Sequence, residues 1–238
     1  MILIYPEKLS TVTADTEDTE YPASNLEDSK IKKVWKSSGS NVGTLTATVS
    51  ANSNKLALFG TNAVSATVTI KIGAVTQETQ NFTLTSGSRT YNRFFCEYTE
   101  IAEVHTIEIL LTAEVGSTVY AGVLKIGYGI ETNNPDYGLS EGRQDFSIIK
   151  ELNNGAYYIR KRDSVRTFTV TFMGERDSVF YQFTDAYDYF GPQACAWLLA
   201  EDIDDYQWAV LGHMISPFKG GHDYFSHSKV SFSITEAV

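Results

Sequence analysis

A cluster of four acidic residues late in the chain is the first candidate for chemistry: Glu201, Asp202, Asp204 and Asp205. Paired carboxylates can cleave glycosidic bonds, and their oxygen atoms can bind calcium. The cluster falls between two predicted strands and has no glycine at the position that a calcium loop requires. A solvated acidic turn is therefore the favoured interpretation, and a hydrolase that uses these acids is the least favoured of three candidate functions, after a structural protein and a carbohydrate-binding module.

Three of the four histidines, His213, His222 and His227, fall close together near Asp223. Histidine nitrogens with a carboxylate can bind zinc, but zinc sites of this kind use tighter spacing on a hairpin or a helix face. Exposed loop histidines are the favoured interpretation. The sequence also has no nucleophile elbow, dinucleotide-binding loop, Walker loop or His-Glu-x-x-His motif. We therefore predict no metal, no cofactor and no catalytic residue, hence no enzyme.

Aromatic residues are abundant, and an exposed ring can stack on the face of a sugar. Four of them fall on a predicted edge loop and are the candidate carbohydrate contacts: Tyr91, Phe94, Phe95 and Tyr98. The favoured interpretation is that an aromatic-rich β protein buries its rings, with sugar stacking as the alternative.

The charge of the chain excludes two classes of partner. Its 238 residues include 19 basic and 29 acidic ones, which gives a net charge of −10. A surface this acidic repels phosphate backbones and anionic lipid headgroups, so we predict neither nucleic acid nor a membrane as a partner. No stretch approaches the roughly 20 apolar residues of a membrane-spanning helix. The N-terminus lacks the features of a signal peptide, so we expect synthesis in a cytoplasm.

The two cysteines, Cys96 and Cys195, fall in different predicted domains. Two buried free thiols are favoured over a disulfide between them. Trp35 and Trp197 lie among apolar neighbours and are predicted to be core residues.

Residues 21–132 are predicted to form a jelly roll or β-sandwich. Val68, Ile70 and Ile72 alternate with polar residues, as in a strand with one buried face. Many short strands of this kind, separated by Gly, Ser and Asn turns, are typical of such folds. The preceding residues, 1–20, are predicted to be a short strand and an acid-rich arm or solvated loop.

Residues 133–143 are rich in turn formers and are the predicted linker. Residues 144–238 are predicted to form a smaller β domain with one packed helix. Asn153-Asn154-Gly155 favours a hairpin turn. Apolar residues at three- and four-residue steps predict the helix over about 176–190, and a Gly-Pro pair ends it. The predicted fold class is therefore mainly all-β.

Several strings, taken in order, resemble the discoidin-like jelly-roll domains and linkers of tailed-phage tail proteins. The strings are YPASNL at 21–26, WKSS at 35–38, LALFGTN at 56–62, VYAGVLKIG at 119–127, the junction at 137–158 and FSITEAV at 232–238. The resemblance covers most of the chain after residue 20. The chain departs from it at Lys36, where arginine is common, and no ligand-binding residue transfers.

The resemblance implies a structural component of a phage tail tip or baseplate, related to distal tail proteins, that assembles in a ring around the tail axis. It implies other tail proteins as partners, namely tail tube, tape measure, hub or fibre proteins. It also implies a homo-oligomeric ring, a host-surface glycan as a candidate ligand of the jelly roll, and location in the virion after synthesis in the host cytoplasm. The alternative function is a stand-alone carbohydrate-binding module with an accessory domain.

Overall fold

The computed structural model describes residues 1–86, 89–132, 139–151, 156–175, 180–200, 208–215, 219–221 and 227–237. The chain divides into two compact units. Unit 1 comprises Met1–Glu131 and Cys195–Leu211, and unit 2 comprises Thr132–Ala194 and Gly212–Val238. Unit 1 ends where the predicted linker begins, but it also contains residues 1–20 and a segment that the sequence assigned to the second domain.

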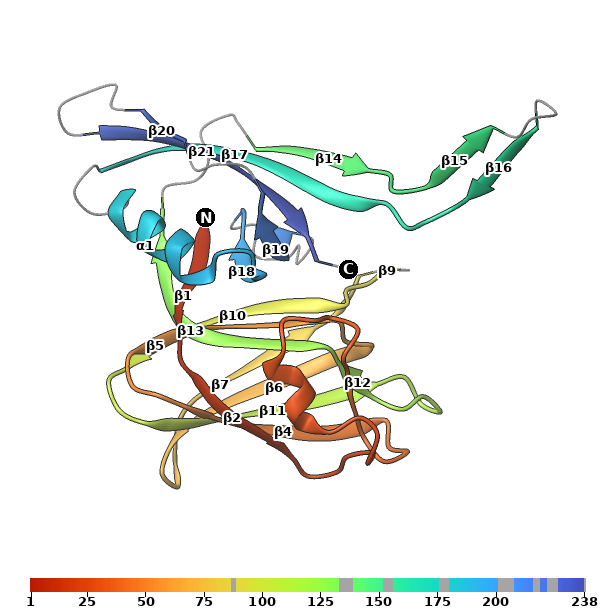
Figure 1. Cartoon of the computed structure of the whole chain (residues 1–238). Coiled ribbons are helices and arrows are strands. Elements are labelled where there is room, and N and C mark those ends of the chain that lie inside the picture. Colours follow the sequence, from red (N-terminus) through yellow and green to blue (C-terminus); the bar gives the residue numbers. More distant parts are fainter. Residues whose placement is uncertain are drawn as a thin grey trace. The chain divides into compact units, whose positions relative to one another are not determined.

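Unit 1 is an antiparallel β-sandwich of two sheets (Figure 1). The first sheet has the order β10 (Arg93–Ile101), β5 (Ser53–Phe59), β13 (Val123–Glu131), β1 (Ile2–Glu7) and β18 (Cys195–Leu198). The second has the order β2 (Leu9–Ala14), β4 (Val42–Val49), β11 (His105–Ala113), β6 (Ala63–Ile72) and β7 (Val75–Thr83). The short elements are η1 (Ala23–Glu27), β3 (Trp35–Lys36), β8 (Thr85–Ser86), β9 (Arg89–Thr90) and β12 (Tyr120–Ala121). The predicted all-β fold is confirmed.

Alternating apolar residues build the core between the two sheets. In β11, Ile107, Ile109 and Leu111 are fully buried, and Ile109 lies between Leu45 of β4 and Val68 of β6. The period of two arises because successive side chains of a strand point to opposite faces. Trp35 also belongs to this core, and Trp197 of β18 is buried as predicted.

The first twenty residues contain the predicted strand, and a second strand stands in part of the stretch predicted as an arm or solvated loop. β1 pairs with β13 in one sheet, and β2 pairs with β4 in the other. Carboxylates hold the acid-rich stretch in place by accepting hydrogen bonds from backbone N–H groups. Asp15 Oδ1 accepts from Thr16 at 2.7 Å and from Thr44 at 2.9 Å, and Glu17 accepts from Ala23 at 2.9 Å. Asp15 and Glu17 are exposed on a loop, as the loop alternative predicted, and they also serve as hydrogen-bond acceptors.

Unit 2 is a smaller antiparallel sheet with one helix. Its strands are β14 (Ser140–Gln144), β17 (Val165–Glu175), β21 (His227–Glu236), β20 (Lys219–Gly221) and the end of β19 (Ala209–Met214). Phe168 and Val170 of β17 face Ile234 and Phe232 of β21, and all four are buried. These apolar residues form one face of the sheet.

The helix α1 (Tyr181–Phe190) lies within the predicted range of 176–190 and ends at the predicted residue. Gly191 follows it with φ +52°, a conformation that glycine adopts readily. Phe183 packs against Phe172 and Phe232, with ring centroids 5.1 and 6.0 Å away. The helix therefore covers the apolar face of the sheet, as a small sheet requires.

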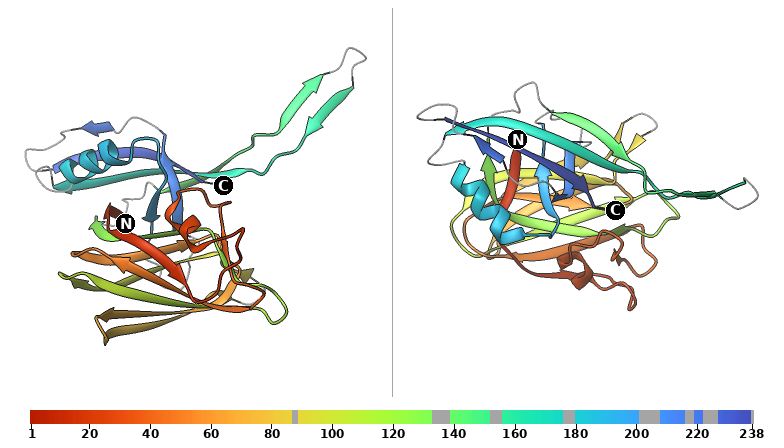
Figure 2. Two further views of the ribbon diagram at one scale, coloured as in Figure 1. Left: turned by 60° about the horizontal axis from the view of Figure 1, so that its bottom comes forward. Right: turned by 45° about the horizontal axis from the view of Figure 1, so that its top comes forward.

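A two-stranded hairpin extends from this sheet. β15 (Ile148–Glu151) pairs with β16 (Tyr157–Arg160), and Ile149 faces Ile159 across the ladder. The hairpin confirms the predicted pairing, while the Asn153-Asn154-Gly155 turn lies outside the described residues. Figure 2 shows the hairpin projecting from the end of β14 and β17, at the opposite end of unit 2 from α1.

Candidate functional site

Two of the predicted sites fall largely outside the described residues. All four acids of the cluster, Glu201 to Asp205, lie there, and so do His222 and Asp223. His213 is described, and its Nδ1 lies 2.8 Å from the Pro192 carbonyl oxygen. Neither the acidic site nor the histidine site is tested by the structure.

The candidate sugar-stacking aromatics lie on a strand rather than on a loop. Phe94, Phe95 and Tyr98 belong to β10, and Tyr91 is half-buried just before that strand. Phe94 is fully buried and stacks on Phe82, with ring centroids 4.9 Å apart. Buried rings have no free face for a sugar, so Phe94, Phe95 and Tyr98 cannot act as stacking platforms in this conformation.

The hydroxyl of Tyr98 instead joins a buried chain of hydrogen bonds. It donates to Ser53 Oγ at 2.8 Å, and Ser53 Oγ lies 3.1 Å from His105 Nε2. His105 Nδ1 lies 2.9 Å from the Glu103 carbonyl oxygen. A proton on Nδ1 satisfies that carbonyl and leaves Nε2 to accept from Ser53. Every member of the chain then has a partner, and burial raises the pKa of Tyr98.

This chain of hydrogen bonds contains a hydroxyl and an imidazole, as a nucleophile and its base would, but it lacks the solvent access and the orienting carboxylate of a catalytic site. Ser53 is 0% exposed and His105 is 2% exposed, so a substrate has no route to the Ser53 hydroxyl. A backbone carbonyl, rather than a carboxylate, orients the imidazole. The arrangement is that of a satisfied core network, which fixes the end of the sandwich.

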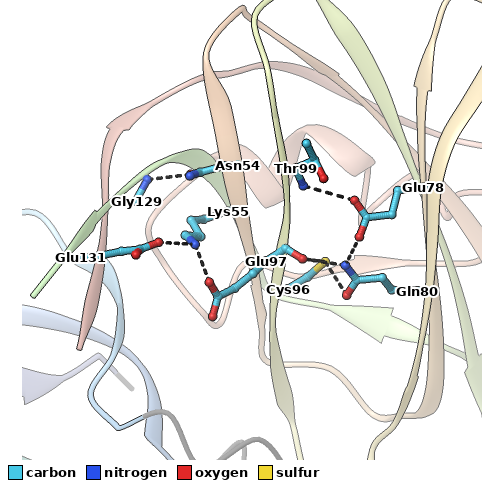
Figure 3. A network of polar contacts seen from close by, with 9 residues as sticks. All are labelled: Asn54, Lys55, Glu78, Gln80, Cys96, Glu97, Thr99, Gly129 and Glu131. Atoms are coloured by element: carbon cyan, nitrogen blue, oxygen red, sulfur yellow. Dashed lines mark hydrogen bonds and ion pairs between the residues drawn. The ribbon is translucent and has the colours of Figure 1, made fainter. Parts of the chain in front are cut away.

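Lys55 is the centre of a second buried polar network in unit 1. It is 4% exposed, and its Nζ pairs with the carboxylates of Glu97 and Glu131, the latter at 2.6 Å (Figure 3). Burial alone would lower the pKa of Lys55, but the hydrogen bonds to Glu131 and Glu97 outweigh it and raise the pKa. A Cβ on Gly129 would lie 2.6 Å from the Lys55 stem, so only glycine leaves room for that stem.

Side chains of β7 close the outer edge of β10 (Figure 3). Gln80 Nε2 donates to the Glu97 carbonyl oxygen at 2.6 Å, and Glu78 accepts from the Thr99 N–H at 3.2 Å. Both strands stand at the ends of their sheets. Unpaired backbone groups at a sheet edge invite pairing with another chain. This part of β10 is therefore an unsuitable surface for strand addition.

The thiols are also buried and unreactive in character. Cys96 is 1% and Cys195 0% exposed, as predicted. Burial raises the pKa of both thiols, that of Cys195 to about 12. Each thiol therefore stays protonated near neutral pH, which does not suit a nucleophile.

The hairpin of unit 2 differs from these buried networks because its apolar side chains face solvent. Ile149, Tyr157 and Ile159 share one face and are 63–66% exposed. Tyr158 lies on the other face and is 52% exposed. Clustered apolar side chains in contact with water usually mark an interaction site.

The charge of the hairpin also differs from that of the rest of the chain. Residues 148–160, which span the hairpin, carry two basic side chains and one acidic one, which gives +1. The remaining residues carry 17 basic and 28 acidic side chains, which gives −11. The positive charge of the hairpin is complementary to the negative charge that the rest of the chain carries, so a further copy of the same protein can attract it.

In the part of the chain that the structure describes, no three His, Cys, Asp or Glu side chains are placed together to hold a metal ion. The helices described have neither the length nor the apolar composition of a membrane span.

Three similar solved structures each match about half of this chain. Chitosan-binding module 1 from the chitosanase/glucanase of Paenibacillus sp. IK-5 has a TM-score of 0.39 and 16% identity, over 50% of this chain and 94% of that chain. CpGH89CBM32-4 of Clostridium perfringens, in complex with GlcNAc-α-1,4-galactose, has a TM-score of 0.39 and 15% identity, over 51% and 90%. Reduced XRCC1, bound to the DNA polymerase β catalytic domain, has a TM-score of 0.41 and 13% identity, over 51% and 97%.

The similar structures include carbohydrate-binding modules as well as a protein that binds a polymerase. Similarity at this level carries no function over to this chain. No protein-family model matches the sequence, and a search of curated proteins gives no relative.

Sequence reasoning missed the Lys55 network and the exposure of the hairpin. The signal for the first is a lysine directly before the apolar run 56–59, in a strand that is buried on both faces. The signal for the second is that 157–159 are apolar without alternation. A two-stranded ribbon with apolar residues on both faces cannot bury them alone.

Proposed function

We propose that this chain is a non-catalytic structural subunit that associates with further copies of itself through the hairpin of unit 2. The observation that carries the proposal is the exposure of Ile149, Tyr157 and Ile159 on one face of that hairpin. Burying these side chains against a neighbour removes apolar surface from water, at about 25 cal/mol per Å².

The described parts of unit 1 support a structural rather than a catalytic role. The groups that could do chemistry there, Ser53, His105 and Cys96, are buried and partnered. Their arrangement stabilises the sandwich and offers a substrate no access.

The resemblance to phage tail proteins supports one setting for the assembly, a tail tip or baseplate of the virion. In that setting the copies form a ring around the tail axis, and other tail proteins bind the ring. This placement rests on the sequence strings alone, and location in the virion is proposed on the same ground.

Sedimentation velocity on the purified chain tests the proposed association. We expect the wild type to form larger species as its concentration rises, and a variant with Ile149→Lys and Ile159→Lys to need at least tenfold higher concentration. The matched control carries Val75→Lys and Val104→Lys, because both valines are 63–66% exposed in unit 1. A wild type that stays monomeric at all concentrations, or a control that weakens association equally, would contradict the proposal.

Carbohydrate binding by unit 1 is the second candidate function. The observation that favours it is that unit 1 is a complete sandwich with its own core, which the resemblance links to a sugar-binding jelly roll. A glycan array tests it with the full chain and with the Ile149→Lys, Ile159→Lys variant. Specific binding by both proteins supports a module that does not need assembly. Absence of binding on an array with diverse bacterial surface glycans would contradict this candidate.

A further inference from the structure

The two faces of the hairpin have different chemistry. Residues that face each other across the ladder share a side of the ribbon. The pairs Ile149–Ile159 and Glu151–Tyr157 form the apolar face already described. The pairs Ile148–Arg160 and Lys150–Tyr158 form the other, which we call the basic face. Lys150, Tyr158 and Arg160 are all exposed, so this face presents two cations beside an aromatic ring.

The outer face of α1 has the complementary chemistry. Tyr181, Asp185, Asp188 and Tyr189 recur at helical spacing, opposite the buried Phe183. The two tyrosines are 52% and 58% exposed, and both aspartates are exposed. We call these four residues the acidic helix face. It presents two carboxylates flanked by two aromatic rings, and the α1 segment contains no basic residue.

The hairpin and the acidic helix face stand at opposite ends of unit 2. α1 covers the sheet at Phe172 and Phe232, whereas the hairpin leaves from the end of β17 near Val165. Figures 1 and 2 show α1 and the hairpin at opposite ends of this unit in every view. The hairpin is therefore remote from the helix of its own chain, and a contact between the two has to join two molecules.

We infer that the basic face of the hairpin docks on the acidic helix face of a second copy of this chain. Lys150 and Arg160 pair with Asp185 and Asp188, while Tyr158 packs beside the tyrosines of the helix. Arginine and lysine also interact favourably with aromatic rings, which adds to the attraction. The inference rests on the proposed function and adds a contact to it, because it uses the face of the ribbon opposite Ile149 and Ile159.

This contact joins two different surfaces, so it is heterologous. Each copy then offers a hairpin at one end of unit 2 and a receiving helix at the other. Contacts of this kind produce a ring if the rotation between copies closes and an open filament if it does not. The inference thus predicts higher oligomers rather than a dimer that stops at two copies.

A charge exchange tests the inference. Variant A carries Lys150→Glu and Arg160→Glu, and variant B carries Asp185→Lys and Asp188→Lys; all four positions are exposed, so both variants are expected to fold. Sedimentation velocity should show each variant alone associating at least tenfold more weakly than the wild type. An equimolar mixture of A and B should recover association, because the hairpin of each then fits the helix of the other.

The outcomes separate this inference from the proposed function. If Ile149→Lys with Ile159→Lys disrupts association but variant B does not, the hairpin binds elsewhere and only the inference is overturned. If A and B each associate weakly and their mixture does not recover association, the proposed pairing of the basic face with the acidic helix face is overturned as well. If the wild type does not associate, the proposed function itself is contradicted. Circular dichroism of A and B checks that both variants fold.

Discussion

Unit 1 and the hairpin of unit 2 place their charged and apolar side chains in opposite ways. Lys55 and Lys125 of unit 1 are each 4% exposed, and carboxylates pair with both. In the hairpin, Ile149 and Ile159 are more than 60% exposed, and Lys150 and Arg160 also face solvent. A region whose buried polar groups are paired within the chain needs no partner to satisfy them. A region that leaves apolar groups in water is suited to bind something else.

This difference also separates two kinds of sheet edge. The β10 edge has its Glu97 carbonyl and Thr99 N–H covered by side chains of β7. The hairpin has two strands, and its side chains are mostly exposed on both faces. We infer that the first arrangement prevents association and that the second promotes it. The following experiments test this contrast, in order of decreasing expected effect.

The largest expected effect is a difference in the free energy of unfolding between substitution of a buried and of an exposed apolar residue of unit 2. Phe172→Ala removes a fully buried ring that contacts Phe183 and Phe232, and should cost about 3–5 kcal/mol. Ile149→Ala on the hairpin should cost less than about 0.5 kcal/mol. Urea unfolding monitored by fluorescence gives both values. Equal losses would mean that the hairpin residue is packed within its own chain.

The next effect concerns the buried lysine of unit 1. Glu97→Gln with Glu131→Gln leaves the Lys55 ammonium buried without a carboxylate, which should cost about 3 kcal/mol. Lys55→Met, the control, removes the charge and keeps an apolar stem, so its cost should be below about 1.5 kcal/mol. Because folding raises the Lys55 pKa, its contribution is complete below about pH 10 and declines at higher pH. A more destabilising Lys55→Met would contradict this account.

A smaller effect is expected from the buried hydrogen-bond chain. Ser53→Ala removes the shared partner of Tyr98 and His105, and should cost about 1–3 kcal/mol. Tyr98→Phe leaves the Ser53–His105 bond in place, so its cost should be nearer about 1 kcal/mol. Thermal unfolding of both variants measures the difference. If Tyr98→Phe proves the more costly change, the chain is not organised around Ser53.

The smallest effect concerns Asp15, which is exposed and holds the loop after β2. The hydrogen bonds from Thr44 and Thr16 outweigh the small burial of this carboxyl and lower its pKa in the folded state. Its contribution is therefore present above about pH 4 and is lost as the pH falls through the folded-state pKa. The urea midpoints of wild type and Asp15→Asn should differ at pH 7 and converge below pH 4. A constant difference would exclude titration of Asp15 as the cause.

Much of the fold follows from local patterns in the sequence. The alternation in 107–111 gives a strand with one buried face, and apolar residues at helical spacing give α1. The predicted hairpin pairs as expected, because its register is set by local chain reversal. These features depend on neighbours in sequence, and for that reason they were predictable.

The parts that were missed depend on contacts between distant residues. Lys55 meets Glu97 and Glu131 only once three strands pair, and the apolar run 56–59 that follows it does not reveal these partners. Phe94 and Tyr98 were placed on a loop, although β10 pairs with β5 and turns both rings into the core, as the favoured interpretation of buried rings predicted. Residues 195–211 were assigned to the second domain, yet β18 pairs with β1 at the other end of the chain. Long-range pairing decides all three.

Hydrogen exchange at two protein concentrations tests most directly whether the hairpin is an assembly surface. The amides of β15 and β16 should exchange rapidly in dilute protein, because an isolated two-stranded ribbon is marginally stable. At high concentration they should become at least tenfold slower, while the amides of β11 in the core of unit 1 should not change. Rapid exchange of β15 and β16 at both concentrations would contradict the account.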